Sequence, residues 1–125
     1  MATQTQNNSG FKTFQATAVA IGVGKRVFVD ASAPSLIAVA GAAVAAIGVT
    51  TENIAASGYG TVKLFNAPGT FIMCANAAIT AGAQIYPTAS GNIDDAGTTA
   101  LPLVALEAAT AQGDLIEVGS ILLGA

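Results

Sequence analysis

The chain reads AIGVGKRVFVDAS at residues 20–32 and AITAGAQIYPTAS at residues 78–90. Ala-Ile begins both segments, Ala-Ser ends both, and a glycine, an aliphatic and an aromatic residue recur between them, 58 residues apart. Looser matches follow, of residues 46–49 with 103–106 and of residues 60–64 with 113–118. Because the recurring positions hold no reactive side chains, the repeat indicates architecture. It predicts two similar halves, at about residues 19–65 and 77–121.

Short strands between small-residue turns dominate both halves. Alternating β-branched, aliphatic and aromatic residues bounded by Gly, Pro, Asn or Ser are typical of strands. Such segments lie at residues 25–30, 61–65, 71–73, 84–86 and 115–121. Their spacing favours a small β-barrel or sandwich built from two similar β-rich halves. We therefore predict an all-β fold with at most one short helix and an extended N-terminal arm.

The Ala-rich segment before residue 50 is ambiguous, because Ala is the best helix former. Gly41 and Gly48 interrupt it, and no charged residue lies between Pro34 and Thr51 to solvate an outer face. We therefore expect a pair of buried strands joined by a tight turn, at residues 36–39 and 44–49. Residues 51–56 and 106–110, which follow strands in the two halves, could each form a single helical turn or a loop.

The first residues differ from the rest of the chain. Residues 1–10 are polar and cannot bury enough apolar area to offset the entropy of ordering. Phe11, Lys12 and Phe14 follow at once, and two aromatic residues at the root of a polar tail could anchor it to the core or to a neighbouring subunit. We predict an N-terminal arm at 1–14, with these three residues binding the capsid or another partner, and a single β-rich domain at 15–125.

Composition favours a protein that assembles. Charged residues make up 9% of the chain, against about 25% in an average soluble domain. A surface with so little charge suggests contact with other protein, although a domain coated with Thr, Ser, Asn, Gln and Ala is the alternative. The net charge is −3, and only four residues are basic: Lys12, Lys25, Arg26 and Lys63. So few cations argue against binding to nucleic acid or to an anionic membrane.

Residues 1–10 lack the basic start of a secretory signal, and the longest apolar run, residues 37–49, is too short for a membrane-spanning helix.

The reactive side chains point away from an enzyme and from a cofactor or metal. The chain has no His, so Ser-His-Asp and Cys-His arrangements cannot be built, and Cys74 in its apolar run is expected to be buried. One Cys cannot supply a zinc site or a disulfide. Asp94 and Asp95 are adjacent and would point to opposite faces of an extended segment, so a solvated turn is the better interpretation.

Residues 22–26, Gly-Val-Gly-Lys-Arg, superficially resemble a phosphate-binding loop. They lack its spacing and the Ser or Thr after the lysine. The matching turn at residues 80–84 has neither Lys nor Arg. A turn entering a strand explains both copies, whereas a phosphate site explains only one.

Several segments of the sequence resemble the small capsid cement, or head decoration, proteins of tailed bacteriophages. The resemblance lies in residues 77–87, 90–93, 103–109 and 112–118, and more loosely in residues 24–29, 47–50 and 60–64. Pro102 departs from the pattern, in which a glycine more often precedes the apolar strand. The resemblance implies a β-rich protein without enzymatic activity that is made in the host cytoplasm and incorporated into the virion. There it would clamp adjacent major capsid proteins from outside, commonly as a homotrimer.

Two other functions stay open. One is a self-assembling shell or fibre protein. The other is a small carbohydrate- or ligand-binding β-domain, for which Tyr59 and Tyr86 are the only polar aromatic residues. Tyr86 matches Phe28 in the repeat, which favours a role in the core.

Overall fold

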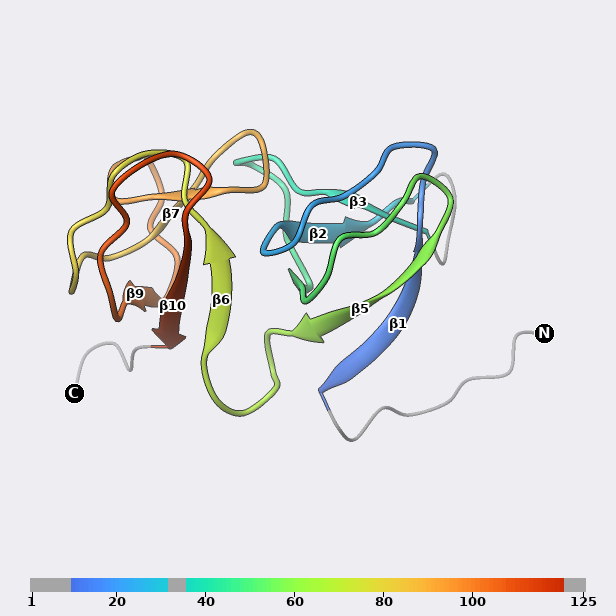
Figure 1. Cartoon of the computed structure of the whole chain (residues 1–125), viewed down its shortest axis with the longest axis horizontal. Helices are drawn as coiled ribbons and strands as arrows, with labels where there is room; N and C mark the ends of the chain where they lie inside the picture. The colour runs from blue at the N-terminus through green and yellow to red at the C-terminus, as the bar shows by residue number, and fades with distance from the viewer. Residues whose placement is uncertain (1–9, 32–35, 121–125) are drawn as a thin grey trace.

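The computed structural model describes residues 10–31 and 36–120, which form ten strands and no helix. The predicted all-β fold is therefore confirmed. Figure 1 shows two halves side by side, with β1–β5 in one and β6–β10 in the other. Within the described ranges, no helix is long and apolar enough to cross a membrane.

The first half is a closed five-stranded barrel, here called the first barrel. Its strands are β1 (Phe11–Ala16), β2 (Arg26–Val29), β3 (Leu36–Val39), β4 (Gly48–Thr50) and β5 (Tyr59–Leu64). They pair in the order β1-β3-β2-β4-β5, and β5 pairs with β1 to close the circle. Only the β1–β3 pair is parallel. The buried core comprises Ala16, Ile21, Val27, Ile37, Ile54 and Val62.

The second half, here called the second barrel, repeats this order. Its strands are β6 (Phe71–Cys74), β7 (Tyr86–Pro87), β8 (Ile93–Asp94), β9 (Leu103–Ala105) and β10 (Leu115–Ser120). β10 pairs with β6 and β9, and β7 pairs with β8. Two single bridges complete the circle: Gln84 with Val104, and Ala75 in parallel with Ile93. The resulting order, β6-β8-β7-β9-β10, is that of the first barrel.

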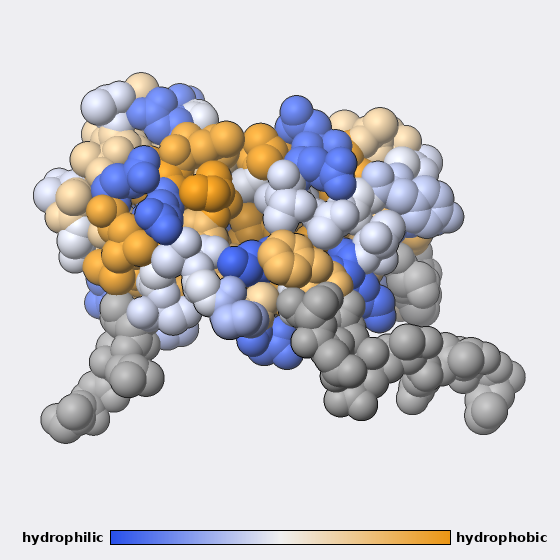
Figure 2. Space-filling model, turned by 60° about the horizontal axis from the view of Figure 1, so that its bottom comes forward, coloured by the Kyte–Doolittle hydropathy of each residue, from blue (hydrophilic) through white to orange (hydrophobic). Residues whose placement is uncertain are grey.

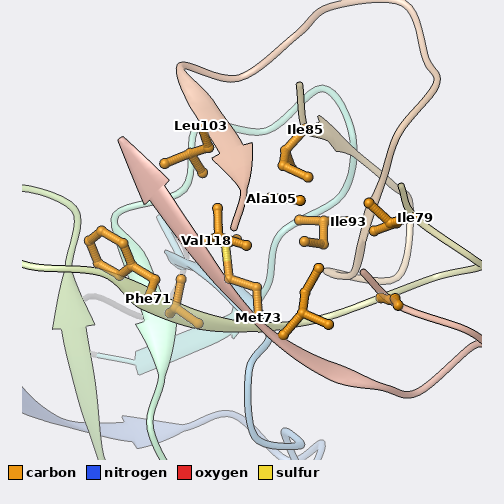
Figure 3. Packing of buried hydrophobic residues seen from close by; sticks show 12 residues of the cluster. Phe71, Met73, Ile79, Ile85, Ile93, Leu103, Ala105 and Val118 are labelled. Atoms are coloured by element: carbon orange, nitrogen blue, oxygen red, sulfur yellow. The ribbon is translucent and has the colours of Figure 1, made fainter. Parts of the chain in front are cut away.

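The second barrel has the larger core. In Figure 3, side chains from β6, β9 and β10 converge with Ile93 of β8 and with Ile79 and Ile85, which precede β7. Phe71, Met73, Ile85 and Val118 are at most 2% exposed. Burying one such side chain contributes about 2 kcal/mol to folding. Val49 of β4 belongs to the same cluster, so the cores of the two barrels meet.

Equivalent hydrogen bonds show how closely the two barrels correspond. Ile21 and Ile54 exchange two backbone hydrogen bonds in the first barrel, as Ile79 and Ala109 do in the second. Ile54 and Ala109 lie in the segments for which a helical turn or a loop was left open, and both segments are loops.

One predicted strand pair is wrong. Residues 36–39 do form β3, but β4 spans only Gly48–Thr50, and the two strands are not neighbours. β2 lies between them, paired with both. The Ala-rich residues between β3 and β4 therefore cross from one side of β2 to the other.

The boundary of the arm also needs correction. Phe11–Ala16 is strand β1, which pairs with β5 along the register Phe11–Lys63 to Gln15–Tyr59. Residues 11–14, predicted to belong to the arm, are part of the barrel wall. The rest of the predicted arm, residues 1–9, lies outside the described residues.

The loose match of residues 60–64 with 113–118 is out of register. Phe14 pairs with Gly60 in the first barrel, and Met73 pairs with Ile116 in the second. The counterpart of Gly113 is Ser57, since both have positive φ, +92° and +58°, and both donate a backbone N–H to the segment after the first strand. The sequence comparison was wrong here because it matched Gly60 with Gly113 only on the identity of the glycines.

Candidate assembly surfaces

The turn at residues 22–26 joins the two barrels. Gly24 has φ +76°, and its carbonyl accepts a hydrogen bond of 2.9 Å from the backbone N–H of Cys74. A Cβ on Gly24 would lie 2.9 Å from Cδ2 of Leu115 and 3.0 Å from the Cys74 nitrogen. Glycine is therefore required here both by the backbone conformation and by the closeness of the second barrel.

Arg26 crosses the same junction and is only 1% exposed. Its backbone N–H donates to Gly91 at 3.0 Å, and its Nη2 donates to the carbonyls of Ala40 at 3.1 Å and Thr88 at 2.7 Å. Burial lowers the pKa of the guanidinium, because removal from water disfavours its charged form. Its Nε has no hydrogen-bond partner among the described residues.

Lys25 adds a side-chain contact to the junction, donating from Nζ to Oδ1 of Asn92, which is itself 4% exposed. Lys25 and Arg26 thus both bond the second barrel. This agrees with the interpretation of residues 22–26 as a turn that serves the fold. Their role in the junction was missed from the sequence. The available signal was the difference between the copies, because Ala83 and Gln84 stand where Lys25 and Arg26 do.

An apolar hollow of about 310 Å³ lies where the two barrels meet. Its lining includes residues 44–46, Phe65, Pro87, residues 101–103 and Arg26. Figure 2 shows hydrophobic surface gathered over the second barrel, on the left, and reaching the boundary with the first.

The predicted partner-binding residues lie on strand β1 but do not form one cluster. Lys12 Nζ lies 5.6 Å from the ring centroid of Phe14, which packs against the core of the first barrel. Phe11 is 44% exposed, and its ring lies 5.7 Å from Nζ of Lys63 on β5. Since successive side chains of a strand point to opposite faces, Phe11 is separated from the other two.

A second hollow, of about 480 Å³, opens on the first barrel and is here called the open face. Its lining comes from β1, the end of β2 and the start of β5: Lys12, Thr13, Phe14, Gln15, Val29 and Tyr59. Tyr59 is 71% exposed and Val29 is 39% exposed. Tyr is enriched in protein interfaces, which makes the open face a candidate interaction surface.

Two reactive side chains, Cys74 and Asp114, have clear structural surroundings. Within residues 10–31 and 36–120, no group of three or more His, Cys, Asp or Glu could hold a metal ion. Cys74 is a free, buried thiol, as predicted. Asp114 accepts hydrogen bonds from the backbone and hydroxyl of Thr110 and from the backbone of Ala111, and these bonds lower its pKa. It thereby closes the turn before β10.

Fold and surfaces together define a tandem β-barrel protein with a tightly bonded junction between its barrels and an open hollow on the first barrel. Among solved structures, the chain is similar to the N base of the head fibre gp8.5 of bacteriophage phi29, with a TM-score of 0.72 and 14% identity. The match covers 91% of this chain and 98% of that one, which shows a shared fold. No protein-family model matches the sequence, and no curated protein matches it significantly.

Proposed function

We propose that this protein is a structural component of a phage head: a cement protein that binds the outside of the assembled capsid as a homotrimer. It would stabilise the shell against the pressure of packaged DNA by adding buried interface between adjacent major capsid proteins. The observation that carries the proposal is the likeness, across nearly the whole chain, to the base of a phage head fibre.

The sequence supports this role independently. The segments that resemble cement proteins occur in both barrels. Because only 9% of the residues are charged, the surface can lie against another protein with little desolvation cost. Many weak contacts repeated by symmetry can then give high avidity.

The decisive experiment mixes the purified protein with undecorated heads of the phage that encodes it. We expect saturable, stoichiometric co-sedimentation and a higher temperature of DNA release. Absence of binding to intact heads would contradict the proposal.

Phe11 provides a residue-level test of the predicted capsid contact. It is 44% exposed, so Phe11→Ala should fold normally and bind heads more weakly. Val19→Ala, at a position 67% exposed in the same barrel, is the matched control. Equal head binding by both variants would remove Phe11 from the contact.

A fibre component is the second candidate, because the similar structure is itself the base of a fibre. Electron microscopy of decorated heads separates the two, since a cement protein gives low density between capsomers and a fibre gives a protrusion.

A further inference from the structure

The two barrels contact each other through unlike surfaces. The first contributes its turn at residues 22–26, and the second contributes a face that includes Cys74, Pro87 and Leu115. Because the barrels share one fold, the first barrel also has a face of this kind and the second barrel also has a turn of this kind. Neither of these is used in the contact between the barrels. Those two unused surfaces are the turn at residues 80–84 and the face of the first barrel that corresponds to Cys74, Pro87 and Leu115.

Strand register identifies that corresponding face. Cys74 pairs with Leu115, as Gln15 pairs with Tyr59. Pro87 pairs with Ile93, as Val29 pairs with Ile37. The counterparts of Cys74, Leu115 and Pro87 are therefore Gln15, Tyr59 and Val29. All three line the open face.

The corresponding turn of the second barrel is also open. Gly82 has φ +85°, close to the +76° of Gly24, and its N–H donates to Ala105 as that of Gly24 donates to Thr50. A Cβ on Gly82 would meet no atom of the described chain within 4 Å, whereas one on Gly24 would collide with the second barrel. The two turns thus have the same backbone shape, but among the described residues only the turn at residues 22–26 packs against another barrel.

The chemistry of the two unused surfaces also matches. Inside the chain, Lys25 of the turn bonds Asn92 of the face. The counterpart of Lys25 is Ala83, and the counterpart of Asn92, which precedes Ile93, is Leu36, which precedes Ile37. A polar pair within the chain is thus replaced by an apolar pair on the two unused surfaces, so the position of that pair would bury no charge on contact.

We propose that the turn at residues 80–84 of one copy docks on the open face of a second copy, repeating between chains the contact that joins the barrels within one. Such a head-to-tail contact uses two different patches and closes into a ring when the rotation permits. The inference deepens the proposed function, since it rests on the trimer proposed there and names the surfaces that build it. Lys12 and Phe14 line the open face, so their partner would be a second copy.

Light scattering after size exclusion tests the contact with full-length variants. Wild type should be a trimer, and Gly82→Asn a monomer, because Asn tolerates positive φ and its side chain would block the approach. Gly113→Asn is the matched control and should stay trimeric, since Gly113 has φ +92°, has no atom within 4 Å of an added Cβ, and corresponds to Ser57 outside the junction. Tyr59→Ala removes the main exposed group of the open face and should also be monomeric.

Mixing the two monomeric variants tests the head-to-tail arrangement. Gly82→Asn keeps an intact open face and Tyr59→Ala keeps an intact turn, so the mixture should form a dimer that neither variant forms alone. A monomeric wild type, a trimeric Gly82→Asn, or a mixture that stays monomeric would overturn the inference. Failure of the trimeric wild type to bind heads would instead contradict only the proposed function.

Discussion

The turns at residues 22–26 and 80–84 have one backbone shape and two different surroundings. In the first, Gly24 touches the second barrel and Arg26 is 1% exposed. In the second, Gly82 has open space around it and Gln84 is exposed. The difference shows that the backbone shape of the turn is a feature of each barrel, whereas Lys25 and Arg26 serve the contact between the barrels. Comparing copies of a repeat can thus separate residues that build a unit from residues that join units.

The largest expected effect comes from enlarging the glycine at the junction. Gly24→Val would place a β-branched side chain at positive φ and against Leu115 and Cys74. We expect a loss of about 4 kcal/mol in the free energy of unfolding, from strain and overpacking together. Gly113→Val meets the strain alone and should cost about half as much. Urea unfolding at equal protein concentration measures both, and equal losses would contradict the close packing at Gly24.

Arg26 provides the next test. Arg26→Ala would leave a cavity and two carbonyl groups, those of Ala40 and Thr88, without their donor. We expect a loss of about 3 kcal/mol. Gln84→Ala, at the exposed counterpart, should change stability by less than about 0.5 kcal/mol. If thermal unfolding showed similar losses for the two, Arg26 would not be the group that secures the junction.

A smaller effect is expected from the pair formed by Lys25 and Asn92. Lys25→Ala leaves the Asn92 amide oxygen without its donor and should cost about 1.5 kcal/mol. Adding Asn92→Leu reproduces the pair of Ala83 and Leu36 and should recover part of that loss. A double-variant cycle measures the coupling, and strictly additive losses would show that the two side chains act independently.

Asp114 should give the smallest effect, and one that depends on pH. Its pKa is depressed in the folded protein, so its stabilising contribution is present above the pKa of the unfolded chain and is lost as pH falls through the folded pKa. Asp114→Asn should therefore be less stable than wild type at neutral pH and equal to it in strong acid. The corresponding turn of the first barrel has Gly58 at this position, so Gly58→Ala should show no such pH dependence. Thermal unfolding across pH checks both variants.

Local patterns predicted the class of fold but not the pairing of its strands. Residues 25–30 and 115–121 contain alternating β-branched and aliphatic residues, and β2 and β10 lie there. Residues 11–14 of β1 were assigned to an arm because they directly follow a polar tail, and only the pairing with β5 shows that they belong to the barrel. The placement of β2 between β3 and β4 depends on contacts between distant segments, which no local pattern records.

The candidate surfaces were predictable only in part. The sequence directed attention to Lys12 and Phe14, which do line the open face. Val29 and Tyr59 join them from other strands, and a linear motif cannot bring these strands together. The closure of each barrel supplies that proximity.

Closure also sets the order in which this protein can fold. The first and last strands of the first barrel meet with Phe11 opposite Lys63, and those of the second with Phe71 opposite Val118. Neither barrel can close until its whole half of the chain is present, and contacts between such distant residues make folding slow. During synthesis, the first barrel can close before the strands of the second have emerged. The turn at residues 22–26 would then already be in place as a template on which β6 and β10 assemble.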